Sequence, residues 1–185
     1  MEAERLIEVS RRALAQSRGA PSIMAEAWQV QALAQAIGEH LAAYGPKTLR
    51  GEARGLGEIG GSGGGAPDHP VVRTGTARAA QLSEVADPRA ALTGLGALLG
   101  EMGMALVAVA CDTGEESLYW QCIEAIDAAD EALDRVHGML RLLAEQDREQ
   151  DRQRERDGAY GAVRGPAGSA AGHHRLHAEI PDEAR

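Results

Sequence analysis

The chain of 185 residues contains no phenylalanine, only three tyrosines and two tryptophans. β-Branched residues are also few, so the residue types that favour strands are scarce. Alanine, leucine, glutamate, arginine and glutamine predominate, and all of these are good helix formers. The composition therefore argues against a sheet-based fold and favours a single all-α domain.

Lysine is almost absent: Lys47 is the only one, and the arginines are dispersed among acidic residues. The formal net charge is −9. A general nucleic-acid binder needs a basic surface to contact phosphates, and adhesion to anionic lipid needs basic clusters. The charge therefore argues against nucleic acid and against a membrane surface as partners.

The chain has two cysteines, Cys111 and Cys122. On adjacent antiparallel helices they would be offset by about six residues, or roughly 9 Å at helical rise. This offset is too large for an unstrained disulfide. The first residues, MEAERLIEVSRR, are charged throughout and do not resemble a signal peptide. We therefore expect two free thiols and a cytoplasmic location.

Residues 1–45 are predicted to form an N-terminal helix pair. The first helix spans residues 2–17, and a Gly-Ala-Pro sequence breaks the chain after it. The second runs to about Tyr44, where Gly-Pro at residues 45–46 is a strong terminator. Both helices carry apolar residues at helical spacing, so each should bury one face.

Residues 87–146 are predicted to form a helical hairpin. Asp87 and Pro88 have the form of an N-cap followed by proline in the first turn, so a third helix begins there. Thr113 and Glu116 have the spacing of a capping box, which predicts the start of a fourth helix. Packed on the N-terminal pair, this antiparallel hairpin gives a four-helix, bundle-like fold.

Residues 46–86 are predicted to join the two pairs as a glycine-rich linker. Eight of the residues 51–65 are glycine, and no phosphate-binding motif accompanies them. We expect a flexible connection with a short helix around residues 76–85. Residues 147–185 are expected to form a charged, fraying helical extension and then, from Gly158 onward, a disordered tail.

Residues 91–111 are apolar enough to raise the question of a membrane span. Glu101 lies in the middle of this stretch, four glycines dilute it, and no basic cluster flanks it. We favour a buried central helix, and a membrane-associated protein is the alternative. Glu101 is then a candidate buried carboxylate, although we favour the alternative that it points outward between helices.

The fourth helix is predicted to have an apolar face and an acidic face, because acids recur every three or four residues opposite its leucines and alanines. Such acids could bind a divalent metal or act as an acid–base pair. The nearest match to the Glu-x-x-His pattern of di-metal bundles is Asp134-x-x-His137, and no second such pair occurs. We favour a solvated acidic face without metal or cofactor, and a metal-binding or enzymatic bundle is the alternative.

Both tryptophans lie away from the apolar stripes. Trp120 projects from the acidic side of the fourth helix, with Ile123 and Glu124 beside it. Trp28 lies off the stripe of the second helix, near Met24. Either the helices bury more than one face, or these side chains form a partner surface, where aromatic residues and methionine are favoured. These five residues are our candidate interface.

The segments ESLYWQCIEAIDAADEALDRV and AEAWQVQALAQAIG resemble a group of uncharacterised actinobacterial proteins of unknown function. The resemblance covers most of residues 1–145, and the arginine-rich, lysine-poor composition fits it. It implies no activity, cofactor or functional residue. From the residues themselves we expect a non-enzymatic helical interaction or scaffold protein, which binds a protein partner or forms a homo-oligomer.

Overall fold

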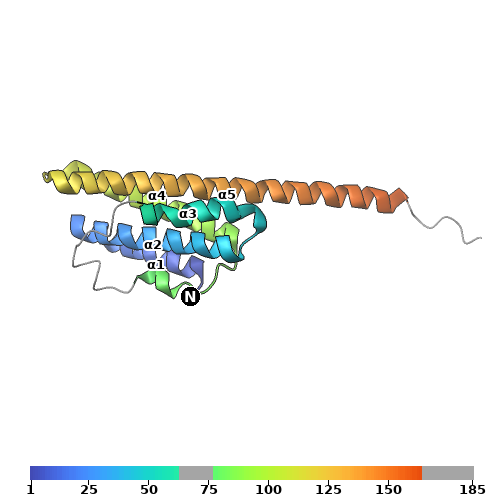
Figure 1. The fold of residues 1–185 in the computed structure, drawn as a ribbon, viewed down its shortest axis with the longest axis horizontal. Helices are drawn as coiled ribbons and strands as arrows, with labels where there is room; N and C mark the ends of the chain where they lie inside the picture. The colour runs from blue at the N-terminus through green and yellow to red at the C-terminus, as the bar shows by residue number, and fades with distance from the viewer. Residues whose placement is uncertain (63–76, 164–185) are drawn as a thin grey trace, which may run out of the picture. The chain divides into compact units, whose positions relative to one another are not determined.

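The computed structural model describes residues 1–62 and 77–163. In these ranges the chain forms five α-helices and two short 3₁₀ helices, without a named strand (Figure 1). The α-helices are α1 (Ala3–Gln16), α2 (Ala20–Tyr44), α3 (Arg50–Ser62), α4 (Pro88–Asp112) and α5 (Glu116–Val163). The 3₁₀ helices are η1 (Lys47–Leu49) and η2 (Arg78–Gln81). The prediction of an all-α protein is confirmed.

The chain divides into two compact units, Met1–Asp147 and Arg148–Arg185. The first unit holds α1 to α4 and α5 as far as Asp147. Its core contains alanine, leucine, isoleucine, valine, methionine and one cysteine, and no aromatic side chain of the described residues is fully buried. Tyr44, the last residue of α2, is 79% exposed. The aromatic residues whose burial is described are therefore exposed or half-buried, and none belongs to the fully buried core.

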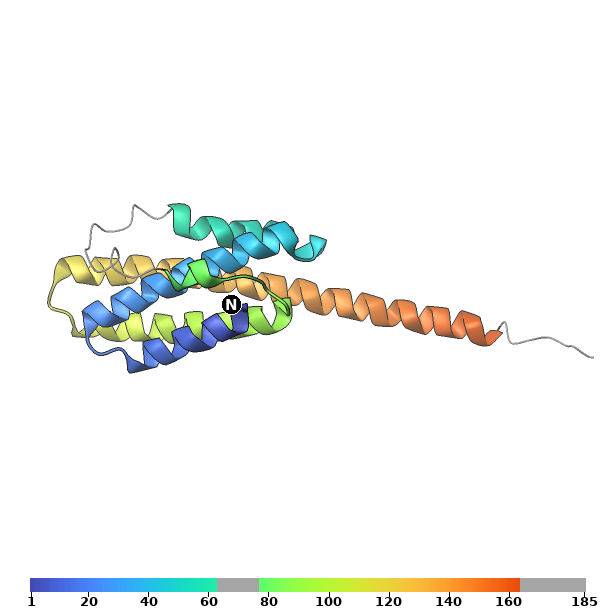
Figure 2. The same ribbon diagram turned by 90° about the horizontal axis from the view of Figure 1, so that it is seen from below.

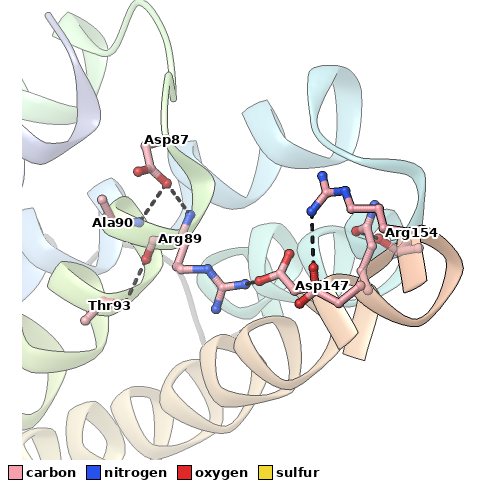
Figure 3. Close-up of polar contacts among 9 residues, drawn as sticks. Asp87, Arg89, Ala90, Thr93, Asp147 and Arg154 are labelled. Carbon is pink, nitrogen blue, oxygen red and sulfur yellow. Dashed lines mark hydrogen bonds and ion pairs between the residues drawn. The ribbon is translucent and has the colours of Figure 1, made fainter. Parts of the chain in front are cut away.

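Asp87 caps the N-terminus of α4, as predicted. Its carboxylate accepts hydrogen bonds from the backbone N–H groups of Arg89 and Ala90, at 2.9 and 3.0 Å (Figure 3). Two otherwise unpaired donors of the first turn are thereby satisfied. The Arg89 side chain then reaches Asp147 on α5, with 2.6 Å between nitrogen and oxygen. The start of α4 is thus tied to α5.

Helices α4 and α5 form an antiparallel hairpin through a three-residue connection (Figure 2). A Cβ atom built on Gly96 of α4 would lie 3.4 Å from the Val136 side chain and 3.6 Å from that of Leu133, both on α5. The connection differs from the predicted capping box. The Thr113 hydroxyl accepts from the N–H of Glu115, two residues on, at 3.1 Å. Thr113 therefore stabilises the turn that precedes α5.

Residues 50–62 form helix α3, so the prediction of a flexible glycine-rich linker is wrong for this part of the chain. Ala53 and Leu56 are fully buried, and α3 lies along α2 in both views (Figures 1 and 2). A Cβ atom on Gly38 of α2 would lie only 2.7 Å from the backbone nitrogen of Gly57. Here glycine permits close helix packing, and this packing outweighs its low helix propensity. Residues 63–76 lie outside the described residues.

The short helix that we expected around residues 76–85 is the 3₁₀ helix η2, and Arg78 anchors it. The Arg78 guanidinium pairs with Glu26 of α2 and donates to the hydroxyl of Ser10 of α1 at 3.3 Å. The backbone N–H of Arg78 donates to the side-chain oxygen of Gln29 at 2.9 Å. The side chains of Arg78 and Glu26 are only 18% and 19% exposed. Arg78 therefore joins the returning chain to two helices.

Helix α5 continues to Val163, so the tail that we expected to be disordered from Gly158 is helical for its first residues. In the second unit, ion pairs join Arg152 to Glu149 and Arg154 to Asp151, three residues apart. These contacts favour continuation of the helix. Residues 164–185 lie outside the described residues.

The close approach of α2 and α3 predicts a large effect of a single methyl group. Gly38→Ala should destabilise the protein by about 1–3 kcal/mol, because the new Cβ would meet backbone atoms that cannot move independently. Gly103→Ala on α4 is the matched control, since nothing lies within 4 Å of its Cβ position. It should stabilise the helix by about 0.5–1 kcal/mol. Urea unfolding followed by circular dichroism measures both, and equal effects of the two substitutions would contradict the packing described.

Candidate functional site

The N-terminal half of α5 has a strongly acidic surface. Residues 116–134 contain six acidic residues and no arginine or lysine. All six are exposed: Glu116, Glu124, Asp127, Asp130, Glu131 and Asp134. Their spacing of three, four and seven residues places many of them on one side of the helix, where like charges repel. This side of α5, which we call the acidic face, therefore carries a concentrated negative charge.

Trp120 lies on the acidic face and is 55% exposed. The neighbouring Tyr119 is also exposed, and the two rings meet edge to face, with centroids 5.4 Å apart and an interplanar angle of 79°. This is a favoured geometry for aromatic pairs. The sequence left open whether Trp120 belongs to the core or to a surface, and the structure places it on the surface. We call Tyr119 and Trp120 the aromatic pair.

The remaining interface candidates occupy different positions. Met24 is half-buried between α2 and α5, where the Cys122 thiol lies 3.7 Å from its sulfur, so it takes part in helix packing. Ile123 and Trp28 are half-buried, and Glu124 is exposed. No ring contact joins Trp28 to Trp120 among the described aromatic residues. Tyr119 was not among the candidates, although its place next to Trp120 was a signal for it.

Glu101 is not a buried carboxylate but points outward, which is the alternative that we favoured from the sequence. Its side chain is 42% exposed and pairs with Arg11 of α1, whose Nε lies 3.1 and 3.0 Å from the two carboxylate oxygens. The hydrogen bonds from Arg11 lower the pKa of Glu101, and the positive charge of Arg11 acts in the same direction. Partial burial raises this pKa, but by less than the hydrogen bonds lower it. The same hydrogen bonds raise the pKa of Arg11. Glu101 points outward because α1 supplies its partner at the rim of the core.

The residues closest to a metal-binding motif, Asp134 and His137, are both exposed on α5. Over the part of the chain that the structure describes, no group of three or more His, Cys, Asp or Glu side chains could hold a metal ion. The carboxylates of the acidic face are therefore exposed surface charges, and one of them, Glu131, lies 4.0 Å from the Arg135 guanidinium.

Helix α4 is long and apolar enough to cross a membrane, with a mean hydropathy of 1.8 over its most apolar 18 residues. One third of that window is buried inside the protein. The buried residues include Leu95, Leu99 and Met102, which face the other helices of the first unit. The core helix of a soluble protein has the same length and composition, so this feature is weak evidence for a membrane span.

Residues 1–142 match a family model that is described as "Family of unknown function (DUF6099)". The chain belongs to this family. The DUF6099 match includes α1 to α4 and α5 as far as Leu142. The acidic face and the aromatic pair thus lie inside the DUF6099 region. Searches of curated proteins and of solved structures gave no match.

The exposure of Trp120 predicts a difference between the two tryptophans in solution. In a Trp28→Phe variant of this DUF6099 protein, Trp120 is the sole tryptophan, and acrylamide should strongly quench its selectively excited fluorescence. In the Trp120→Phe variant, the half-buried Trp28 should be quenched several-fold less. Stern–Volmer constants measure the difference. Weaker quenching of Trp120 than of Trp28 in dilute solution would contradict the exposed position.

The Arg11–Glu101 pair predicts a stability effect that depends on pH. Because the folded-state pKa of Glu101 is lowered, the pair stabilises the fold above the unfolded-state pKa of about 4.3. That contribution is lost as the pH falls through the lower, folded-state pKa. Glu101→Gln should therefore destabilise the protein slightly at about pH 7, and by less at about pH 3.

Urea unfolding of the wild type and Glu101→Gln at the two pH values tests this effect. Arg11→Gln is the matched variant, and the double variant should lose no more stability at neutral pH than either single one. A destabilisation by Glu101→Gln that is the same at both pH values would show that the ion pair is not its cause.

Proposed function

We propose that this DUF6099 protein is a non-enzymatic helical interaction protein, which binds a protein partner through the aromatic pair and the acidic face of α5. The observation that carries the proposal is the exposure of Trp120 in a chain that has only two tryptophans. An exposed aromatic pair offers a large apolar area to a partner, and little conformational entropy is lost when the two rings are fixed by binding. Tryptophan and tyrosine are enriched among the residues that dominate binding energy at interfaces.

The surroundings of Trp120 indicate the chemistry of that partner. Glu116, Glu124 and Asp127 lie four residues before, four after and seven after Trp120, so they share its side of the helix. A partner surface that carries arginine or lysine would pair with these carboxylates. Its cations would also stack on the tryptophan ring, which is the best aromatic acceptor for them. We therefore expect a basic partner segment, with association that is fast at low salt.

Location and origin are part of the same proposal. Cys111 and Cys122 are both free, which supports a reducing compartment such as the cytoplasm. The arginine-rich, lysine-poor composition supports an actinobacterial source. Neither point is needed for the interaction itself, which rests on α5.

Substitution of Trp120 tests the proposal. The full chain, immobilised as bait, is exposed to lysate of the source organism at low ionic strength, together with Trp120→Ala and Tyr44→Ala baits. Tyr44 is the control because it is also an exposed aromatic residue, 79% exposed, at the end of α2. A partner held by the wild type and by Tyr44→Ala should bind Trp120→Ala at least about tenfold more weakly, as expected for a central interface residue.

Two further measurements make this result decisive. Circular dichroism and urea unfolding should show that Trp120→Ala keeps the wild-type fold. A double variant, Glu124→Gln with Asp127→Asn, should weaken the same partner and reduce the salt dependence of its binding, because it removes two of the charges. If Trp120→Ala unfolds, or binds the partner as tightly as the wild type does, Trp120 is a structural residue and the proposal fails.

A further inference from the structure

Helix α4 has a second apolar face, which is exposed. It consists of Ala97, Gly100, Met104, Val107 and Cys111, all of them exposed, and Met104 is 73% exposed. The intervals between these residues alternate between three and four. Such an alternation produces the continuous seam of a coiled coil, in which each apolar side chain meets a second helix. We call these five residues the outer seam of α4.

The outer seam lies between two helices of the first unit and is covered by neither. A Cβ atom on Gly94 would lie 3.3 Å from Ile7 of α1, and one on Gly96 would lie 3.4 Å from Val136 of α5. In contrast, nothing lies within 4 Å of a Cβ atom on Gly100. Because Met104 and Val107 are also exposed, the seam is an unpartnered strip of a helix whose opposite side is the core.

The charge around the outer seam differs from that of the acidic face. Helices α1 and α4 together carry four acidic and four basic residues, whereas residues 116–134 of α5 carry six acids and no arginine or lysine. Two copies of the chain would repel each other if they met through their acidic faces. They would meet without net repulsion through α1 and α4.

The rim of the outer seam is also self-complementary in charge. Glu101 lies at its edge towards α1, where Arg11 pairs with it, and both side chains remain 42% exposed. In a twofold-symmetric contact, Arg11 of one copy can face Glu101 of the other, and the same pairing recurs at the symmetry-related position. One arginine and one glutamate at the rim therefore suit a second copy better than a partner of one charge sign.

We propose that two copies of this chain associate through the outer seam of α4. The seam is separate from the aromatic pair and the acidic face, so this proposal goes beyond the interaction proposed for α5 and does not depend on it. Met104 is the midpoint between Ala97 and Cys111. It therefore meets Met104 of the second copy whether the two α4 helices run parallel or antiparallel. The small Ala97 and Gly100 side chains let the helices approach closely.

The size of the seam sets the strength of the contact. A single helix face with a polar rim forms a small interface, which is typical of weak or transient association. We expect a dissociation constant on the order of 1–100 μM. Sedimentation equilibrium of the full chain over this concentration range should show a monomer and a species of twice the chain mass.

Charged substitutions at Met104 test the contact directly. Met104→Glu and Met104→Arg should each raise the dissociation constant at least about tenfold. Tyr44→Glu introduces the same charge at an equally exposed position on α2 and should leave it unchanged. An equimolar mixture of the Glu and Arg variants should restore the dimer, because opposite charges then meet at the centre. Circular dichroism verifies that each variant keeps its helical content.

Four outcomes would overturn the proposal: a wild-type chain that stays monomeric throughout the range, a dimer that survives both Met104 substitutions, a mixture of the variants that does not associate, or a seam that binds lipid. The last would appear as a monomer that floats with phospholipid vesicles in a manner sensitive to Met104→Glu. Trp120→Ala should leave the dimer intact. Failure of the α5 interaction and failure of the α4 contact are thus observed separately.

Discussion

Close approach of helix backbones is the constraint on which this fold depends. Helices α2 and α3 are so close at Gly38 that a Cβ atom on this residue would lie only 2.7 Å from the backbone nitrogen of Gly57. The core around these helices consists mainly of alanine, leucine and other aliphatic residues, with no fully buried aromatic residue among those described. Because no aromatic side chains fill the space between the helices, the helices must lie close together to exclude water from the core. Small residues at the crossings permit this close approach.

A core of this kind has a consequence for the surface. The large aromatic side chains are left outside it, and Trp120 lies among carboxylates on α5. At the same time α4, which supplies many of the buried leucines, remains apolar on its outer side around Met104. The first unit therefore has two exposed surfaces of contrasting character. One combines aromatic rings with negative charge, and the other is apolar with balanced charge at its rim.

Much of the helical framework could be predicted from the residues. Asp87 and Pro88 are a local start signal, and the structure shows the predicted cap, because capping involves only the first turn. The glycine-rich segment could not be interpreted in this way. Glycine is frequent both in flexible linkers and at close helix crossings, and only the position of Gly57 against Gly38 distinguishes the two. The partner of Glu101 could not be predicted for a similar reason, since Arg11 is 90 residues away in the chain.

The sequence by itself determined the helical class, the start of α4 and the existence of an acidic face on α5, because these follow from propensity, capping and periodicity within a few turns. The tertiary structure decided which sides of those helices remain exposed. Periodicity marks an apolar stripe but does not show whether a neighbour covers it. In α4 one apolar side is buried and the other is not, and in α5 Trp120 stays outside the core. Exposure depends on packing between distant segments, and the candidate surfaces of this protein depend on exposure.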